Sequence, residues 1–268
     1  MSVASVRGIE LAYTDVGTGL PPVVLLHGYP FNRSMWDGQV RELSGRWRVI
    51  APDLRGHGES GAGDGAAVTT MEELAEDVAA LLDALRLERV VLGGLSMGGY
   101  VALAFYRRFR ERVRALVLAD TRATPDTEEA RRGREESAQK ILSAGMKPVA
   151  DAMLPKLLAP ATLENNAEVA ARVRGMMERT KPEGAVAALR GMAARRDQTE
   201  LLAEIDVPTL VIVGSLDTLT PPRDAESLRA RVRGSRLVVI EGAAHVSNVE
   251  RPAEFNRALA EFLETLEP

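Results

Sequence analysis

The sequence contains no cysteine, and this absence removes several kinds of chemistry at once. Disulfide bonds, thiolate nucleophiles and cysteine-ligated metal sites all need that side chain. A chain without disulfides suits a reducing compartment, and residues 1–15 lack the basic-then-apolar pattern of a secretory signal. We therefore expect a cytoplasmic protein.

A large charge of one sign and long apolar runs are absent as well. The 34 basic and 38 acidic residues leave a net charge of −4, which gives no electrostatic basis for binding nucleic acid or an anionic membrane. No apolar run approaches the roughly 18 residues of a membrane-spanning helix. Short arginine clusters at 131–134 and 195–196 are interpreted as solvated helix faces. We expect no nucleic-acid or membrane partner, and the sequence leaves homo-oligomerisation open.

Metal-binding patterns are missing too. The three histidines, His27, His57 and His245, lie in three different segments. None has the H-x-H or H-x-x-x-H spacing that brings two imidazoles to one ion, and no Walker motif is present. We expect neither a metal nor another cofactor.

The most informative stretch is a glycine-rich turn between an apolar strand and an apolar helix. Residues 90–92 have the character of a buried parallel strand, and the G-L-S-M-G motif at 94–98 follows them. G-x-S-x-G between a strand and a helix is the nucleophile elbow. Gly94 and Gly98 are needed where a Cβ would collide with a neighbouring strand or helix. The helix directs its N-terminal amides at the serine, and Ser96 is predicted to be a nucleophile.

Strand-like and helix-like segments alternate on both sides of this turn. Strands are predicted at 23–26, 48–51, 90–92, 115–119, 209–213 and 237–240, and helices at 36–43, 71–87, 223–232 and 252–266. This alternation predicts parallel βαβ units in a doubly wound, mostly parallel α/β sheet, preceded by an antiparallel hairpin at 3–15.

The alternation stops after the sixth strand. From 121 to 198 the sequence is helix-like, charged and rich in alanine and methionine, with proline breaks and no strand-like run. We interpret it as a helical cap inserted over the carboxyl edge of the sheet. The predicted domains are therefore a core of residues 1–120 and 199–268 and a cap of residues 121–198.

A serine hydroxyl needs a general base, and a histidine base needs a carboxylate to orient it. His245 follows the 237–240 strand, at the sheet edge where Ser96 also emerges. Asp217 follows the 209–213 strand and satisfies the chain order Ser…Asp…His. Asp120 ends the preceding strand and is the competing acid; we expect it instead to anchor the start of the insert.

An oxyanion hole needs two convergent N–H donors. The amide of Met97, directly after the nucleophile, is one candidate, and the amide of Tyr29, in the loop after the 23–26 strand, is the other. His27 is expected to orient that loop by hydrogen bonding. Asp53 and His57 are expected to have structural roles in a polar turn.

Five motifs in order resemble those of the α/β-hydrolase superfamily, over essentially the whole chain. They are H-G-Y-P at 27–30, D-L-R-G-H-G-E-S at 53–60, G-L-S-M-G-G at 94–99, G-S-L-D-T-L-T-P at 214–221 and G-A-A-H-V-S-N-V-E-R-P at 242–252. The sequence looks most like small bacterial carboxylesterases, 3-oxoadipate enol-lactonase-like hydrolases and cofactor-free haloperoxidases (perhydrolases). The resemblance implies a triad of Ser96, Asp217 and His245, with Tyr29 and Met97 as oxyanion amides. A serine at position 96 argues against the aspartate-dependent haloalkane dehalogenases and epoxide hydrolases of this fold.

The expected activity is hydrolysis of a small carboxylic ester or lactone through an acyl-enzyme. Two alternatives stay open: a perhydrolase or haloperoxidase-like activity of the same triad, and a low-turnover receptor that keeps the triad. Side chains expected in the substrate pocket are Tyr29, Met146, Met153, Leu157, Leu219 and Val246. Packing of the cap onto the core accounts for its apolar residues, including Leu154 and Leu158, equally well.

Overall fold

The apolar runs of the sequence become neighbouring strands of one sheet in the computed structural model, which describes residues 2–63, 65 and 67–266. The strands are β1 (Ser2–Val6), β2 (Ile9–Val16), β3 (Val23–Leu26), β4 (Val49–Pro52), β5 (Val90–Leu95), β6 (Val113–Ala119), β7 (Thr209–Gly214) and β8 (Arg236–Ile240). Their order is β1-β2-β4-β3-β5-β6-β7-β8. The β1–β2 hairpin is antiparallel and joins β4 in antiparallel fashion, whereas the pairs from β4 to β8 are parallel. The α/β fold with a mostly parallel sheet is confirmed.

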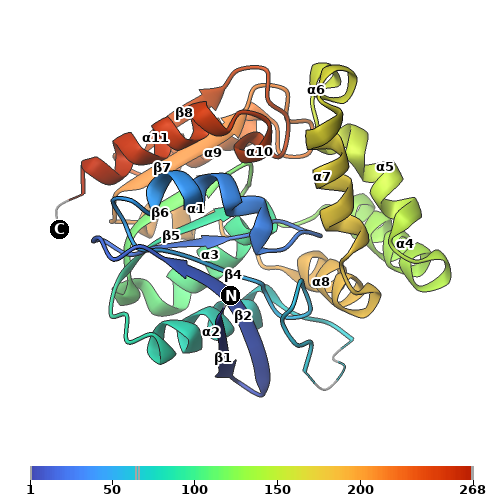
Figure 1. Ribbon diagram of the computed structural model, residues 1–268, viewed down its shortest axis with the longest axis horizontal. Coiled ribbons are helices and arrows are strands. Elements are labelled where there is room, and N and C mark those ends of the chain that lie inside the picture. Colours follow the sequence, from blue (N-terminus) through green and yellow to red (C-terminus); the bar gives the residue numbers. More distant parts are fainter. Residues whose placement is uncertain (1, 64, 66, 267–268) are drawn as a thin grey trace.

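Helices cover both faces of this sheet (Figure 1). They are α1 (Asp37–Leu43), α2 (Met71–Ala84), α3 (Met97–Phe109), α4 (Glu128–Ala144), α5 (Lys147–Leu157), α6 (Pro160–Asn165), α7 (Ala167–Glu178), α8 (Pro182–Ala194), α9 (Pro222–Arg231), α10 (Ser247–Glu250) and α11 (Pro252–Glu264). Short 3-10 helices lie at Arg33–Trp36, Arg110–Arg112 and Leu201–Glu204. The capping box of Thr70 and Glu73 explains why α2 begins at Met71.

Side chains of the central strands alternate between two hydrophobic clusters, one on each face of the sheet. Val24 and Leu26 of β3 join the cluster that α2, α3 and α9 cover. Val23 and Leu25 join the cluster that α1 and α11 cover. Burial on both faces explains why these strands are continuous apolar runs rather than alternating ones.

The helices α4–α8, hereafter the helical segment, lie together at one end of the sheet (Figure 1). No described residue between β6 and β7 is in a strand. Several hydrogen bonds join this segment to the rest of the fold. Among them, Thr180 Oγ1 donates to the Pro30 carbonyl at 2.6 Å, and the Ala159 amide donates to Glu250 Oε1 in α10 at 2.8 Å. A separate cap domain with boundaries at 121 and 198 stays a prediction.

Two local features differ from the sequence expectations. Strand β5 extends to Leu95 instead of ending at Leu92, because Gly93 and Gly94 continue the ladders with both β3 and β6. The four-residue helix α10 was not expected, since it is too short to show helical periodicity. Among the described residues, no helix has the length and apolar character needed to cross a bilayer.

Candidate active site

Ser96 lies at the junction of β5 and α3, in a backbone conformation that is rare outside glycine. Its φ of 55° and ψ of −114° form the tight turn expected of a nucleophile elbow. A Cβ at Gly98 would lie 2.2 Å from the Leu26 carbonyl oxygen, and one at Gly94 would lie 2.1 Å from the Gly98 carbonyl oxygen. The two glycines therefore let α3 pack against β3 and β5 closely enough to hold the turn. Thr121 Oγ1 fixes it further by donating to the Ser96 carbonyl at 2.9 Å.

The structure brings together the three side chains that the sequence placed in a triad. His245 Nε2 lies 2.8 Å from Ser96 Oγ, and His245 Nδ1 lies 2.8 Å from Asp217 Oδ2. The three residues come from the loops after β5, β7 and β8, so the carboxyl edge of the sheet assembles them. Asp217 and His245 are buried, and their pairing is sheltered from water.

Asp217 is held rigidly by more than the histidine. The amides of Leu219 and Thr220 donate to its Oδ1 at 2.8 and 3.0 Å, and Thr220 Oγ1 donates to its Oδ2 at 2.7 Å. Burial favours the neutral acid, but the charge of His245 and the hydrogen bonds from His245 and Thr220 outweigh it and hold the pKa of Asp217 below its usual range. Asp217 therefore carries its charge at neutral pH.

Asp120, the competing acid, makes different contacts. Its Oδ1 accepts a hydrogen bond from the Gly214 amide at 2.8 Å, and its Oδ2 accepts one from Ser247 Oγ at 2.5 Å. Burial and the nearby charge of Asp217 raise the pKa of Asp120 well above its usual range. Asp120 thus ties β6 to β7 and to α10, and no hydrogen bond joins it to His245.

The two amides expected at an oxyanion hole belong to segments next to the serine. Met97 opens α3, where first-turn amides have no acceptor within the helix. Tyr29 follows Gly28, and a Cβ on that glycine would lie 3.4 Å from Ser96 Cβ, so this loop passes close to the nucleophile. Neither amide donates a hydrogen bond to another described residue.

The other two histidines are buried away from the triad. His27 Nε2 accepts a hydrogen bond from the Leu54 amide at 2.9 Å, and its ring packs 5.1 Å from that of His57. Burial lowers the pKa of His27 to about 4, and burial together with His27 lowers that of His57 to about 3. Both are therefore neutral at physiological pH. Asp53 accepts hydrogen bonds from the Arg33 amide and side chain, which fits a structural role.

A cavity of about 390 Å³ opens above Ser96 and His245. Four of the six predicted pocket residues line it: Tyr29, Met153, Leu157 and Leu219. Met146 and Val246 do not line it, because both are buried in the packing of the helical segment and the His245 loop. Lining residues that sequence reasoning did not identify are Tyr100, Arg122, Ala130, Gly133, Arg134, Ser137, Val149, Lys156, Leu189, Met192 and Thr220.

Two arginines expected on solvated helix faces are not free in solvent. The Arg195 side chain is buried, and its Nη1 lies 2.7 Å from Asp126 Oδ1. Arg134 also pairs with Asp126 and lines the cavity. The expectation failed because a charged helical segment has the same sequence pattern whether its arginines meet water or a buried carboxylate.

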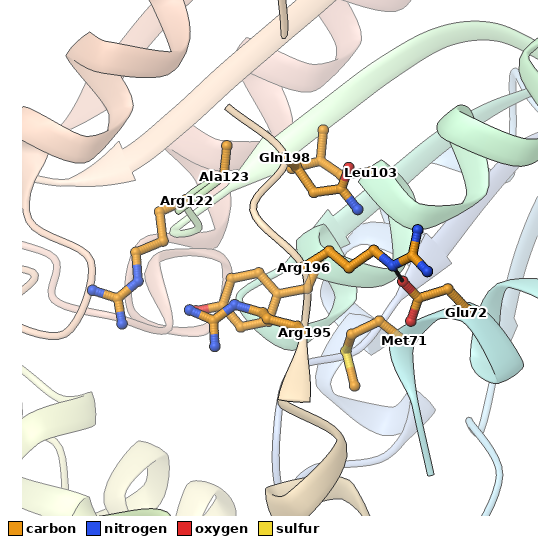
Figure 2. A pocket seen from close by; sticks show the side chains of 9 residues that line it. Met71, Glu72, Leu103, Arg122, Ala123, Arg195, Arg196 and Gln198 are labelled. Carbon is orange, nitrogen blue, oxygen red and sulfur yellow. Dashed lines mark ion pairs between the residues drawn. The ribbon is translucent and has the colours of Figure 1, made fainter. Parts of the chain in front are cut away.

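A second, much smaller cavity of about 10 Å³ lies beside the first and shares Tyr100 and Arg122 with it. Figure 2 shows Arg196 turned toward Glu72, at 3.8 Å, while Arg122 extends in the opposite direction. The Arg195 guanidinium lies 4.2 Å from the centre of the Tyr100 ring. This volume accommodates about one water molecule, so it is not a substrate site.

Within the described part of the chain, no three His, Asp or Glu side chains are grouped as metal ligands. The residues around Ser96 form a different constellation. A hydroxyl within hydrogen-bonding distance of an imidazole, itself paired with an ionised carboxylate, can perform nucleophilic catalysis.

Comparison with known proteins places the chain among relatives of one fold. Residues 21–252 match the family model of the alpha/beta hydrolase fold. The 3-oxoadipate enol-lactonase 2 of Acinetobacter baylyi is 30% identical over 94% of this chain and 92% of the relative. A thermophilic esterase from Thermogutta terrifontis, solved with malate bound, is 42% identical with a TM-score of 0.96 over the full length of both chains. The enol-lactonase of Burkholderia xenovorans LB400 is 34% identical with a TM-score of 0.91, covering 98% of this chain and all of that one. The fold, the ordered motifs and these matches show that the chain belongs to the α/β-hydrolase family.

Proposed function

We propose that this α/β hydrolase cleaves small carboxylic esters or lactones through an acyl-enzyme on Ser96. The observation that carries the proposal is the continuous contact from Ser96 Oγ through His245 to Asp217, with both distances at 2.8 Å. The relatives include esterases and enol-lactonases, whose substrates contain the same carboxylic ester bond.

The first half of the reaction follows from the hydrogen bonds around His245. Asp217 binds Nδ1 and so leaves Nε2 free to accept the proton of Ser96 Oγ. The oxygen attacks the carbonyl carbon of the ester, and the carbonyl oxygen becomes an oxyanion. The amides of Tyr29 and Met97 are the proposed donors to that oxyanion. Met97 directly follows the serine, the loop before Tyr29 passes close to it, and neither amide makes another hydrogen bond within the described residues.

The second half reuses the same groups. His245, now protonated, gives its proton to the leaving alkoxide, and the acyl group stays on Ser96. Water takes the place of the alcohol, His245 removes its proton, and attack on the acyl-enzyme releases the acid. In a lactone the leaving oxygen stays attached to the acyl chain, so a single product forms. A saturated lactone gives a hydroxy acid, and an enol lactone gives an enol acid that tautomerises to the keto acid.

Burst kinetics with 4-nitrophenyl acetate test the proposal. We expect one equivalent of nitrophenol to be released rapidly, followed by steady turnover, if deacylation is the slower half. Ser96→Ala should abolish both phases, lowering turnover by about 10⁶-fold, because no nucleophile remains. Mass spectrometry of the stopped reaction should find the added acetyl group on Ser96.

Other outcomes would contradict hydrolysis. Acyl transfer to hydrogen peroxide at a rate far above that to water would instead favour the perhydrolase alternative. Tight binding of an ester with about one turnover would favour a receptor. Full activity in Ser96→Ala would remove the acyl-enzyme from the mechanism.

A further inference from the structure

The cavity above Ser96 is lined by three cationic side chains and by no acidic side chain among the described residues. Arg122, Arg134 and Lys156 line it, whereas no aspartate or glutamate does so among the described residues. Lys156 is exposed and has no ion pair to a described carboxylate. An apolar ester gains nothing from three cations, and burying charge without a partner is costly.

The carboxylates behind the cavity wall neutralise only part of this charge. Asp126 is buried and pairs with Arg134 and Arg195. Burial disfavours its charged form, but Arg134 and Arg195 hold the pKa of Asp126 below its usual range, so it is ionised. The Asp126 carboxylate is thus already paired with two guanidinium groups, and it cannot also neutralise Arg122.

Arg122 is the least satisfied of the guanidinium groups that line the cavity. Its Nη2 is 3.5 Å from Asp126 and its Nη1 is 3.9 Å from Asp224, so the two carboxylates are at or beyond the limit of a hydrogen bond. Its Nε is buried and has no hydrogen-bond partner in the described structure. Arg122 lies three residues after the end of β6 at Ala119, and its side chain lines the cavity that contains Ser96.

Tyr29 adds an unpaired hydroxyl to the same wall. The residue is 7% exposed and lines the cavity, and its hydroxyl is buried without a hydrogen-bond partner among the described residues. Burial raises the pKa of this phenol, and the nearby charge of Arg134 partly opposes the rise. The hydroxyl therefore stays protonated and can donate a hydrogen bond.

We propose that Arg122, assisted by Arg134 and the Tyr29 hydroxyl, binds a carboxylate carried by the substrate at a distance from the ester bond. The substrate class is then monoesters of dicarboxylic acids, or lactones that carry a carboxylate, rather than neutral esters. Lys156, at the exposed side of the cavity, attracts such anions toward it. This inference rests on the proposed ester or lactone hydrolysis and specifies its substrate.

The preference can be measured with matched pairs of substrates. Monomethyl succinate, glutarate and adipate are each compared with the neutral methyl ester of the same chain length, and acid release is followed by pH-stat titration. We expect the unmodified protein to favour at least one charged ester by about 10- to 100-fold in kcat/KM, as expected for a hydrogen bond between charged groups. Arg122→Met should remove most of that preference, and Arg122→Lys should retain part of it.

Two further variants separate this role from a structural one. Arg132→Met removes an exposed charge from the same helix as Arg134 without touching the cavity, and should leave the preference unchanged. Tyr29→Phe removes only the unpaired hydroxyl, so it should fold normally and lower the preference by about 3- to 10-fold. Tyr29→Phe keeps the test decisive if Arg122→Met does not fold.

Binding without turnover distinguishes the two proposals. Glutarate is titrated by calorimetry into Ser96→Ala and into Ser96→Ala/Arg122→Met, and we expect about 10- to 100-fold weaker binding in the second. If no ester is cleaved but this difference appears, the proposed function fails and the anion site stands. The anion site is overturned if neutral esters are cleaved with the same kcat/KM as charged ones. It is also overturned if the preference for charged esters survives Arg122→Met.

Discussion

At the scale of single residues, the contacts of His245 distinguish between the two aspartates that the sequence offers as candidates for the acid of the triad. Asp217 contacts the imidazole, whereas Asp120 contacts the Gly214 amide and Ser247. Chain order and position after a strand were enough to rank Asp217 first. They did not reveal Thr220, whose hydroxyl donates to Asp217 and lies 3.3 Å from His245 Nδ1.

The two aspartates should respond differently to the same change. Asp217→Asn should lower kcat by about 10⁴-fold, because an amide no longer selects the required tautomer of His245. Asp120→Asn should cost less than about tenfold, because an asparagine resembles the neutral acid that the raised pKa of Asp120 favours. Steady-state kinetics with 4-nitrophenyl acetate measure both, and a larger loss in Asp120→Asn would refute the assignment.

The charged residues of the cavity show what sequence reasoning could not reach. Arg122 follows a strand and Arg134 sits on a charged helix, and neither position differs in pattern from a solvated one. Both lie close to Asp126 in the sequence, but their place on the cavity wall depends on the tertiary structure, in which α4 packs against α8. The packing of one helix on another leaves no trace in local spacing.

At the scale of elements, predictions succeeded where local chemistry determines the structure. Continuous apolar runs predicted β3, β5, β6 and β7, and helical periodicity predicted that α2 begins at Met71. The extension of β5 through Gly93 to Leu95 was missed, because glycine is a poor strand former. These residues are in a strand because β5 pairs with β3 on one side and with β6 on the other.

A substitution at Gly98 tests why the nucleophile elbow needs glycine at this position. Gly98→Ala places a methyl group 2.2 Å from the Leu26 carbonyl, so α3 must move away from β3. We expect the free energy of unfolding to fall by roughly 2 kcal/mol or more, with loss of esterase activity. Chemical denaturation monitored by circular dichroism measures the first effect.

Gly133→Ala is the matched control. Gly133 is an exposed residue within α4, and a Cβ there meets no atom within 4 Å. Because alanine favours a helix over glycine, the free energy of unfolding should rise by about 0.5–1 kcal/mol. Equal destabilisation by the two substitutions would mean that close packing at the elbow is not the reason for Gly98.

At the scale of the whole molecule, the buried histidines make stability depend on pH. In the folded state the pKa of His27 is about 4 and that of His57 about 3, below the ordinary value of 6.5. Between pH 6.5 and about 4 the unfolded chain therefore binds protons that the folded chain excludes. The free energy of unfolding should fall as the pH drops through this range, with a slope of up to about 1.4 kcal/mol per pH unit for each histidine.

Denaturation of the unmodified protein and of His57→Gln between pH 7.5 and 4.5 measures this contribution. The carboxylates contribute equally to both proteins, so the difference in slope isolates His57. We expect the variant to lose stability less steeply below pH 6.5. Parallel curves would show that His57 titrates normally in the folded protein.

The bonds from Ala159 to Glu250 and from Thr180 to Pro30 have a consequence for how relatives of this chain diverge. Glu250 also accepts a hydrogen bond from the Ala244 amide at 2.6 Å, directly before His245, and Pro30 directly follows Tyr29. A chimera that received a foreign helical segment should thus disturb two groups at once: the proposed general base, His245, and the proposed oxyanion donor, the Tyr29 amide. Substitutions that change the substrate but preserve the catalytic rate should therefore accumulate at cavity-lining positions such as Met153. They should leave the Ala159–Glu250 and Thr180–Pro30 hydrogen bonds intact.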